Sequence, residues 1–128
     1  MKIIRSSPPE FVDLRGGISK ILDLLPDQTP IKSVLLISSQ KGAVRANHYH
    51  KKDTHYCYIL SGRMEYSERP VEGGEVQSAV LEPGDMVFTP AMTIHALKAL
   101  EDSEFLALAT ESRGQEKYEE DTVRIKLI

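Results

Sequence analysis

Three of the four histidines in this 128-residue chain lie close together, at His48, His50 and His55, and the fourth, His95, follows forty residues later. Neutral imidazole is the commonest side-chain ligand for Zn, Cu, Fe and Ni. A single strand histidine is more often a packing or surface residue. Here, however, no histidine is left over elsewhere. The joint pattern therefore indicates a site for one divalent transition metal (Fe, Ni, Zn, Mn, Co or Cu), without selecting among them.

The spacing of the histidines predicts strands that converge on one point. Side chains two apart in a strand project from the same face, so His48 and His50 point together. The polar segment 51–54 is expected to form a turn, and His55 then opens a returning strand opposite His50. His95 follows two turn signals and begins a later strand. An ion about 2.0–2.2 Å from each nitrogen can bridge such a set, so we predict all four as ligands.

Four further side chains are candidates for substrate contacts. Arg45 could bind an anion, although strict alternation turns it away from His48 unless a bulge intervenes. Tyr66 could offer a hydroxyl group, and Phe88 and Met92 could line a cavity. Aromatic residues and methionine also serve as ordinary packing residues in β-proteins. Both roles therefore stay open for Tyr66, Phe88 and Met92, and the alternative for Arg45 is a solvent or interface position.

Short apolar segments separated by glycine and proline turns must position these residues. About eight such segments are typical of an antiparallel sandwich or small barrel. The segment 18–25 has helical apolar spacing before Pro26, and it is expected as a short helix or as a strand entering the sheet. The expected strands are 31–38, 43–50, 55–67 (bent at Gly62), 75–81, 85–89, 94–100, 104–110 and 121–128. We predict an all-β fold, a small antiparallel β-barrel of the jelly-roll type with a short N-terminal helix or irregular segment.

Composition and charge narrow the class of protein. The chain is 27% charged and 41% hydrophobic, as expected for one globular domain over residues 1–128. The net charge of -3 comes without a basic stripe, so no nucleic-acid partner is expected. No apolar run approaches the ~18 residues of a membrane span. The single cysteine, Cys57, excludes an internal disulfide, and without a secretory signal we expect a cytoplasmic protein.

Two stretches resemble the paired motifs of the cupins. Residues 42–62 are similar to the first motif, in which glycine precedes an H-x-H pair and a second glycine follows. Residues 84–99 resemble the second motif through Gly84, Pro90 and His95. Together the stretches span roughly half of the chain. The resemblance implies a small β-barrel whose mouth holds one metal ion, with His48, His50 and His95 among its ligands.

The match departs from the cupin pattern at three positions. His55 stands where the first motif has glutamate, Met92 where the second has glycine, and Ala99 where it has asparagine. Four neutral imidazoles leave the full charge of a divalent ion, which a carboxylate would partly neutralise. Such a site should attract anionic ligands more strongly. Four-histidine cupins include oxygen-using enzymes and proteins of undefined role.

A second, looser resemblance is to cupin-type sugar-nucleotide ketoisomerases and epimerases. It rests on Asp13, Arg15 and Gly16 and on Arg45, His48, His50 and Lys51. In that family the barrel holds no metal, and a histidine of the H-x-H segment acts as a base next to a sugar ketone. A site that needs one base does not need four imidazoles, which argues against the metal-free version here.

Three functions therefore fit the sequence. The first, which we favour, is a metal-dependent enzyme of the dioxygenase, isomerase or hydrolase type acting on a small oxygenated or carbohydrate-like substrate. The second is a metal-free sugar-nucleotide ketoisomerase or epimerase, and the third is a non-catalytic module that binds a metal or ligand. Each has a small-molecule partner. Because sheet edges need cover, and small cupins commonly pair through them, we also expect a homodimer.

Overall fold

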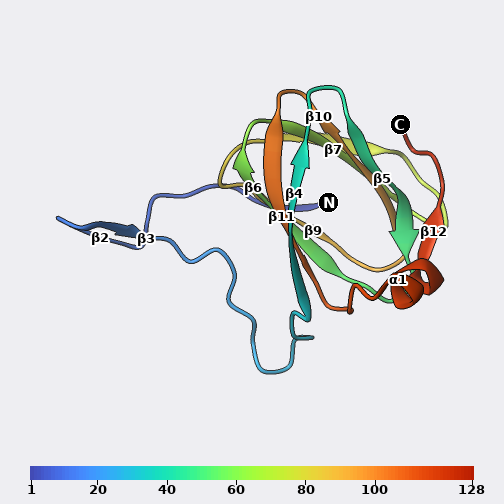
Figure 1. Cartoon of the computed structure of the whole chain (residues 1–128), viewed down its shortest axis with the longest axis horizontal. Coiled ribbons are helices and arrows are strands. Elements are labelled where there is room, and N and C mark those ends of the chain that lie inside the picture. The colour runs from blue at the N-terminus through green and yellow to red at the C-terminus, as the bar shows by residue number, and fades with distance from the viewer.

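Two five-stranded antiparallel sheets face each other in the computed structural model, which describes residues 1–128 (Figure 1). The first sheet has the order β1-β9-β6-β11-β4, with bounds Lys2–Ile4 (β1), Met86–Thr89 (β9), His55–Ser61 (β6), Ser103–Ala109 (β11) and Ser33–Ser39 (β4). The second has the order β12-β5-β10-β7-β8, with bounds Thr122–Arg124 (β12), Val44–His50 (β5), Thr93–Ala99 (β10), Met64–Pro70 (β7) and Gln77–Leu81 (β8). The predicted all-β antiparallel barrel is confirmed.

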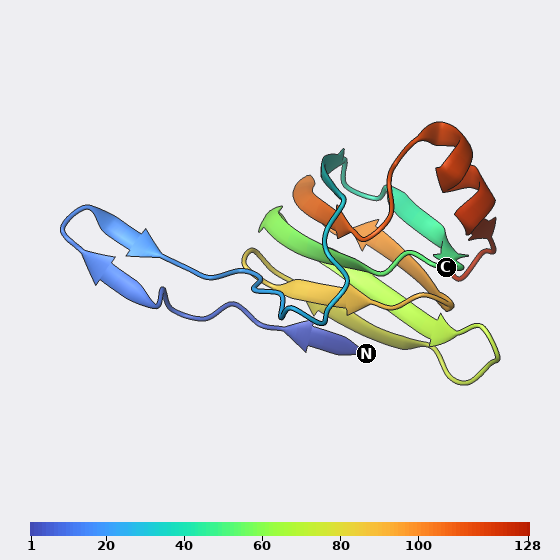
Figure 2. The ribbon, with the colours of Figure 1, turned by 90° about the horizontal axis from the view of Figure 1, so that it is seen from below.

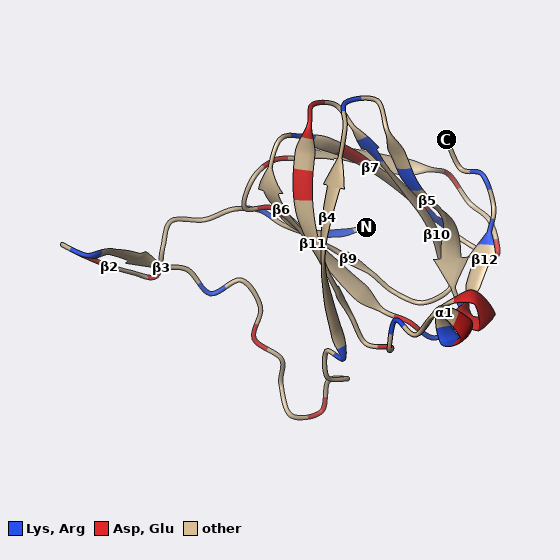
Figure 3. Cartoon of the chain, viewed as in Figure 1, with Lys and Arg blue, Asp and Glu red and all other residues tan.

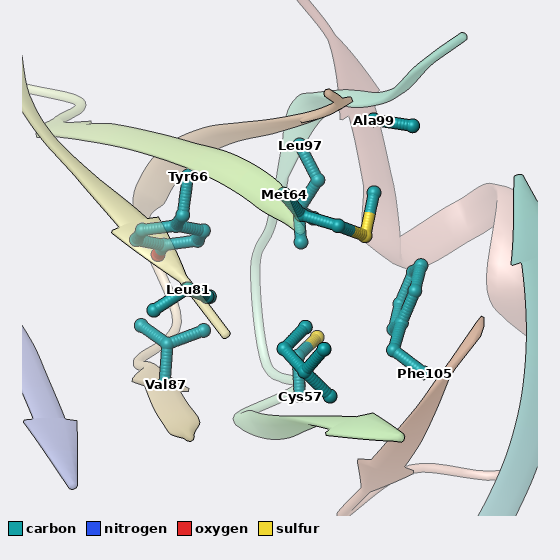
Figure 4. Packing of buried hydrophobic residues seen from close by; sticks show 9 residues of the cluster. Cys57, Met64, Tyr66, Leu81, Val87, Leu97, Ala99 and Phe105 are labelled. Carbon is teal, nitrogen blue, oxygen red and sulfur yellow. The ribbon is translucent and has the colours of Figure 1, made fainter. Parts of the chain in front are cut away.

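The hydrophobic core fills one end of the space between the sheets (Figure 4). It contains Cys57, Ile59, Met64, Tyr66, Leu81, Val87, Leu97, Ala99 and Phe105. Alternation along the strands selects these positions, since inward residues two apart share a face. Full burial of a side chain such as Phe105 contributes about 1.5–3 kcal/mol. In β10 the same inward face changes from Leu97 to His95, so the core gives way to a polar site along the strand.

The predicted bend at Gly62 separates β6 from β7. Its φ of 81° lies in the left-handed region that favours glycine. A Cβ atom at this position would collide with the carbonyl oxygen of Asp102 and with Ser103. Glycine therefore satisfies both the backbone conformation and the close approach of the neighbouring loop.

A bulge in β5 changes which side chains face the interior. β10 pairs with β5 at His48 and next at Ala46, so Asn47 is an extra residue in β5. Ala46 and Asn47 have φ values of 69° and 53°, in a left-handed conformation that costs roughly 1–2 kcal/mol per non-glycine residue. The extra residue resets the alternation. Arg45 and His48 therefore both border the space between the sheets.

Residues 5–32 leave the barrel as an arm, which Figure 2 shows in side view. Within it, β2 (Phe11–Asp13) and β3 (Gly16–Ile18) pair only with each other. Neither of the two alternatives for 18–25, a helix or a strand of the barrel, forms, because the segment has no regular secondary structure after Ile18. It is the irregular N-terminal segment that the predicted fold allowed. Leu22 and Leu24 are the partly buried residues there. Their spacing of two indicates an extended chain rather than a helical face.

The C-terminal part contains the single helix, α1 (Gln115–Asp121), directly before β12. None of the predicted elements covers residues 115–120, and acidic residues are prominent along the helix (Figure 3). The strand predicted over 121–128 is confined to residues 122–124. No helix in the chain combines the length and apolar character needed to cross a membrane. The helix lies beside the end of β5 that carries His48 and His50 (Figure 1).

Candidate metal centre

The four histidines meet at the polar end of the space between the sheets. His48 and His50 come from β5, His95 from the adjacent β10, and His55 from β6 of the other sheet. Five of the ring-to-ring centroid distances among them lie between 4.5 and 5.9 Å. His50, His55 and His95 are buried. The structure therefore brings together the side chains that the sequence predicted.

The potential ligand atoms form two overlapping groups. One contains His48, His50 and His95, and the other contains His50, Asp53 and His55; within each, the atoms lie within 4.8 Å of one another. His50 belongs to both groups. Asp53 was not predicted as a site residue, because it lies in the polar turn and carries no signal beyond its closeness to His55 in the sequence.

Oxygen acceptors orient two of the rings. The Nδ1 atom of His95 lies 2.9 Å from the carbonyl oxygen of Thr93. The Nδ1 atom of His55 lies 3.1 Å from Oδ2 of Asp53. A histidine that donates from Nδ1 leaves Nε2 free to bind a metal, and such partners are typical of ligating histidines.

A hydrogen-bond chain assigns the same tautomer to His50. The hydroxyl of Thr122 donates to the carbonyl oxygen of Tyr118 at 2.6 Å. The hydroxyl oxygen of Thr122, Oγ1, also lies 3.2 Å from Nδ1 of His50. Since the hydroxyl proton is already used, Nδ1 of His50 is the donor in this contact. Nε2 of His50 is then unprotonated and available to a metal.

Burial sets the protonation of the histidines. Burial, followed by repulsion between rings, lowers the pKa of His48 to about 3 and that of His50 to about 4. Burial also holds the pKa of His95 well below its ordinary value. These rings are neutral at pH 7, which is the form that binds metals. Burial is the largest single effect on His55 and opposes its charge too, but the interactions with Asp53 and Cys57 together outweigh burial and raise the pKa of His55 to about 9. A metal that binds Nε2 of His55 at pH 7 therefore displaces a proton from this ring.

A cavity of about 350 Å³ opens onto the four histidines. Its walls are apolar, with Leu35, Ile37, Leu97, Phe105, Ala107 and Ala109 among the lining residues. Three arginines, Arg45, Arg113 and Arg124, also border it. The volume suits a small molecule, and the arginines favour one that carries negative charge.

The structure separates the four predicted substrate-contact residues. Arg45 borders the histidine cavity, and it donates hydrogen bonds to Ser39 Oγ and to a strand carbonyl. Tyr66 lies in the closed core with its hydroxyl 2.8 Å from that of Thr89. Phe88 occupies an outward position of β9, and Met92 lies in a turn with 44% of its surface exposed. None of these last three lines the cavity.

Arg113 and Tyr118 are site residues that the sequence did not indicate. The guanidinium of Arg113 lies 4.0 Å from the ring centroid of Tyr118. That ring in turn lies 5.7 Å from His50 and 6.4 Å from His48. Both residues belong to a segment dominated by charged side chains, where no periodic pattern marks an inward face.

The comparison with protein families identifies the chain. Residues 35–111 match the cupin domain, which is more than half of the sequence and contains all four histidines. The chain therefore belongs to the cupin family. No curated protein matches it in sequence.

Solved structures show the same fold. An rmlC epimerase from Mycobacterium tuberculosis has a TM-score of 0.78 and 18% identity, over 96% of this chain and 67% of that one. QdtA, a sugar 3,4-ketoisomerase from Thermoanaerobacterium thermosaccharolyticum, has a TM-score of 0.75 and 21% identity, over 96% and 86%. The capsular polysaccharide assembling protein CapF from Staphylococcus aureus has a TM-score of 0.68 and 18% identity, over 73% of this chain, which spans only 26% of CapF. Both predicted resemblances are confirmed, at the level of family and fold.

Proposed function

We propose that the chain is a metal-dependent cupin in which His48, His50, His55 and His95 bind one divalent transition metal. The observation that carries this proposal is the convergence of four imidazoles, three of which have oxygen partners at Nδ1. The donor set fits such an ion, because imidazole nitrogens suit Fe, Ni, Zn, Co and Cu and also occur in Mn sites. Asp53 would orient His55 from behind.

We propose an enzyme of the dioxygenase, isomerase or hydrolase type acting on a small oxygenated or carbohydrate-like substrate. When bound, the metal would supply Lewis-acid chemistry, or oxidative chemistry with dioxygen if it is iron. The chain would supply an apolar cavity that excludes water and arginines that attract a negatively charged group. Arg45 is the one sequence-predicted substrate residue that we retain in this role.

Metal analysis tests the proposal directly. We expect the protein, purified without an affinity tag, to hold close to one transition-metal equivalent per chain, with anomalous scattering centred between the histidines. The His50→Ala variant should lose most of this metal, whereas Lys52→Ala, in the neighbouring turn, should keep it. A folded parent that takes up no metal from any of the six candidate ions would contradict the proposal.

A metal-free sugar-nucleotide ketoisomerase or epimerase is the second candidate. The contact of 3.1 Å between His55 and Asp53 favours it, because a carboxylate often orients a histidine used in proton transfer. The fold similarity to QdtA and rmlC points the same way. Thermal stabilisation of the metal-free protein by a nucleotide sugar, with turnover unaffected by chelators, would favour this candidate over the metal-dependent one.

A non-catalytic ligand-binding module is the third candidate. Ligand binding without turnover, whichever of the six metals is supplied, would favour it.

We propose a homodimer, since β4 leaves an uncovered edge on the first sheet. We also propose a cytoplasmic location, to which the single, buried and unpaired Cys57 is suited.

A further inference from the structure

The cavity at the histidines has apolar walls that the chain itself leaves partly uncovered. Leu35 and Ile37 of β4 point inward, yet both are only partly buried. Ala46 and Ala107 line the same space and are also only partly buried. Apolar surface that stays accessible to water is stabilised when an apolar group covers it. The cavity therefore favours a ligand with an apolar body.

Arg113 places an unpaired positive charge at the entrance of this cavity. It lines both the cavity and the polar cleft beside α1, and His50 and Tyr118 line both spaces as well. The ion pairs and side-chain hydrogen bonds of the chain involve other arginines. The stacking of Arg113 on the ring of Tyr118, at 4.0 Å from the centroid, holds the guanidinium in place and leaves its N–H donors free.

The other two arginines of the cavity are already bound within the chain. Arg124 pairs with Glu119 through both Nη atoms, each 3.0 Å from a carboxylate oxygen. Arg45 donates from Nε to Ser39 Oγ at 3.0 Å and from Nη2 to a strand carbonyl oxygen at 2.6 Å. Arg113 is therefore the arginine that offers its full set of donors to a ligand.

The charge of Arg113 also reaches the histidines. After burial and the repulsion among the rings, it is a further cause that lowers the pKa of His48 and of His50. The ring of Tyr118, on which the guanidinium lies, has its centroid 5.7 Å from that of His50 and 6.4 Å from that of His48. An anionic group bound to Arg113 would thus lie beside the histidines, at the polar end of the apolar walls.

We propose that the cavity binds a small carboxylic acid with an apolar body, whose carboxylate pairs with Arg113 and whose body lies against Leu35 and Ile37. The planar fork of a guanidinium matches the two oxygens of one carboxylate. A nucleotide sugar fits less well, because its phosphates and hydroxylated rings offer little apolar surface to these walls. The inference rests on the proposed function in taking the histidine cavity as the substrate site, and it narrows the class of substrate.

Phenylacetate and its uncharged analogue phenylacetamide test the role of Arg113 by isothermal titration calorimetry. We expect the parent, stripped of metal by a chelator, to bind the acid at least about tenfold more tightly than the amide, because hydrogen bonds between charged groups are the stronger ones. Arg113→Gln should bind the two compounds equally. Arg69→Gln is the matched control and should keep the preference, because Arg69 also lacks an acidic partner and lies outside the cavity.

The apolar body is tested separately with acetate, which has the charged group without the ring. We expect acetate to bind the parent at least about tenfold more weakly than phenylacetate does. Ala107→Leu fills part of the cavity, so it should weaken the binding of phenylacetate and leave that of acetate unchanged. The comparison of the two acids uses the parent, so it does not depend on how this variant folds.

Equal affinity for acid and amide in the parent, or a preference for the acid that survives in Arg113→Gln, would overturn the proposal. So would phenylacetate that binds no more tightly than acetate, or UDP-glucose that binds more tightly than phenylacetate. Because these titrations use metal-free protein, they decide the inference even if the chain takes up no metal and the proposed metal centre fails. A metal centre that forms in a protein without the preference for the acid would remove this inference alone.

Discussion

At the scale of single residues, metal affinity depends on the hydrogen-bond partner of a ligating histidine as well as on the histidine itself. Thr122 fixes the tautomer of His50, because its hydroxyl proton goes to Tyr118 and its oxygen accepts from the ring. We expect Thr122→Val to weaken metal binding by about 10–100-fold, the usual effect of losing such a partner. Competition with a chromophoric chelator measures this. Thr54→Val is the control, because the hydroxyl of Thr54 makes no hydrogen bond in the structure. If Thr122→Val bound the metal as tightly as the parent, the assigned tautomer of His50 would be refuted.

Asp85 gives the stability of the fold a dependence on pH. Burial raises the pKa of this carboxyl group, but hydrogen bonds from the backbone of Glu82 and Ser6 and from Arg5 outweigh burial and leave it below the ordinary value. A folded-state pKa below the unfolded one contributes stability above the unfolded pKa, near ~3.9. That contribution is lost as the pH falls through the folded pKa.

The Asp85→Asn variant isolates this contribution. At pH 7 it should be less stable than the parent by about 1–3 kcal/mol, the usual cost of leaving buried partners unsatisfied. Below the folded-state pKa the parent carries a neutral carboxyl group, so the difference should shrink. Urea unfolding of both proteins across the acid range measures it. A difference that stays constant down to the acid limit would show that the charge of Asp85 is not the cause.

At the scale of elements, the turn before β10 carries measurable backbone strain. Met92 has φ of 61° and is 44% exposed, at the position where the second cupin motif has glycine. The turn is held by its backbone, since Met92 N donates to the carbonyl oxygen of His50 at 2.8 Å. Glycine would keep that bond and relieve the left-handed strain of about 1–2 kcal/mol.

We therefore expect Met92→Gly to stabilise the protein by about 1 kcal/mol, after glycine's own entropy cost is subtracted. Met92→Ala is the control, because it removes the side chain and keeps the strain. Thermal and urea unfolding compare the two with the parent. If alanine stabilised as much as glycine, the backbone explanation would be wrong and the side chain itself would be unfavourable.

The strands were predictable because turn residues and apolar runs alternate regularly along the chain. The apolar spacing of the segment 18–25 matches a helix, although the chain there is extended. The bulge at Asn47 carries no sequence signal, because neither Ala46 nor Asn47 is glycine although both have positive φ. It decides the position of Arg45, which strict alternation would have turned away from the cavity.

The site was predictable where its residues share one strand. His48 and His50 lie two apart, and His55 follows across a short turn, so local geometry places them together. Arg113 and Tyr118 reach the site through the path of the C-terminal segment, which no local pattern encodes. The contact of Asp53 with His55 was not predictable, because it depends on the geometry of the turn in the folded chain. Tyr66, Phe88 and Met92 were predicted from their residue types. Residue type does not specify how deeply a side chain is buried or which face of a strand it occupies.

At the scale of the whole molecule, the histidines join two sheets that otherwise meet through packing. His48, His50 and His95 belong to the second sheet, while His55 belongs to the first. An ion shared by all four would cross-link the sheets at their polar end, opposite the hydrophobic core. Its binding energy would then add to the stability of the folded state.

Metal loading and removal should reveal this cross-link. With free metal at about 100 times its dissociation constant, the parent should gain roughly 2.7 kcal/mol of unfolding free energy, and a chelator should remove the gain. The His55→Ala variant keeps the three ligands of the second sheet, so it should bind the metal more weakly and gain less. Amide hydrogen exchange locates the effect: metal should slow exchange in β5, β6 and β10 of the parent, but only in β5 and β10 of the variant. Each protein is compared with its own metal-free form, so the loss of His55 itself does not confuse the result. Equal protection of β6 in both proteins would place the ion on the second sheet alone and exclude His55 as a ligand.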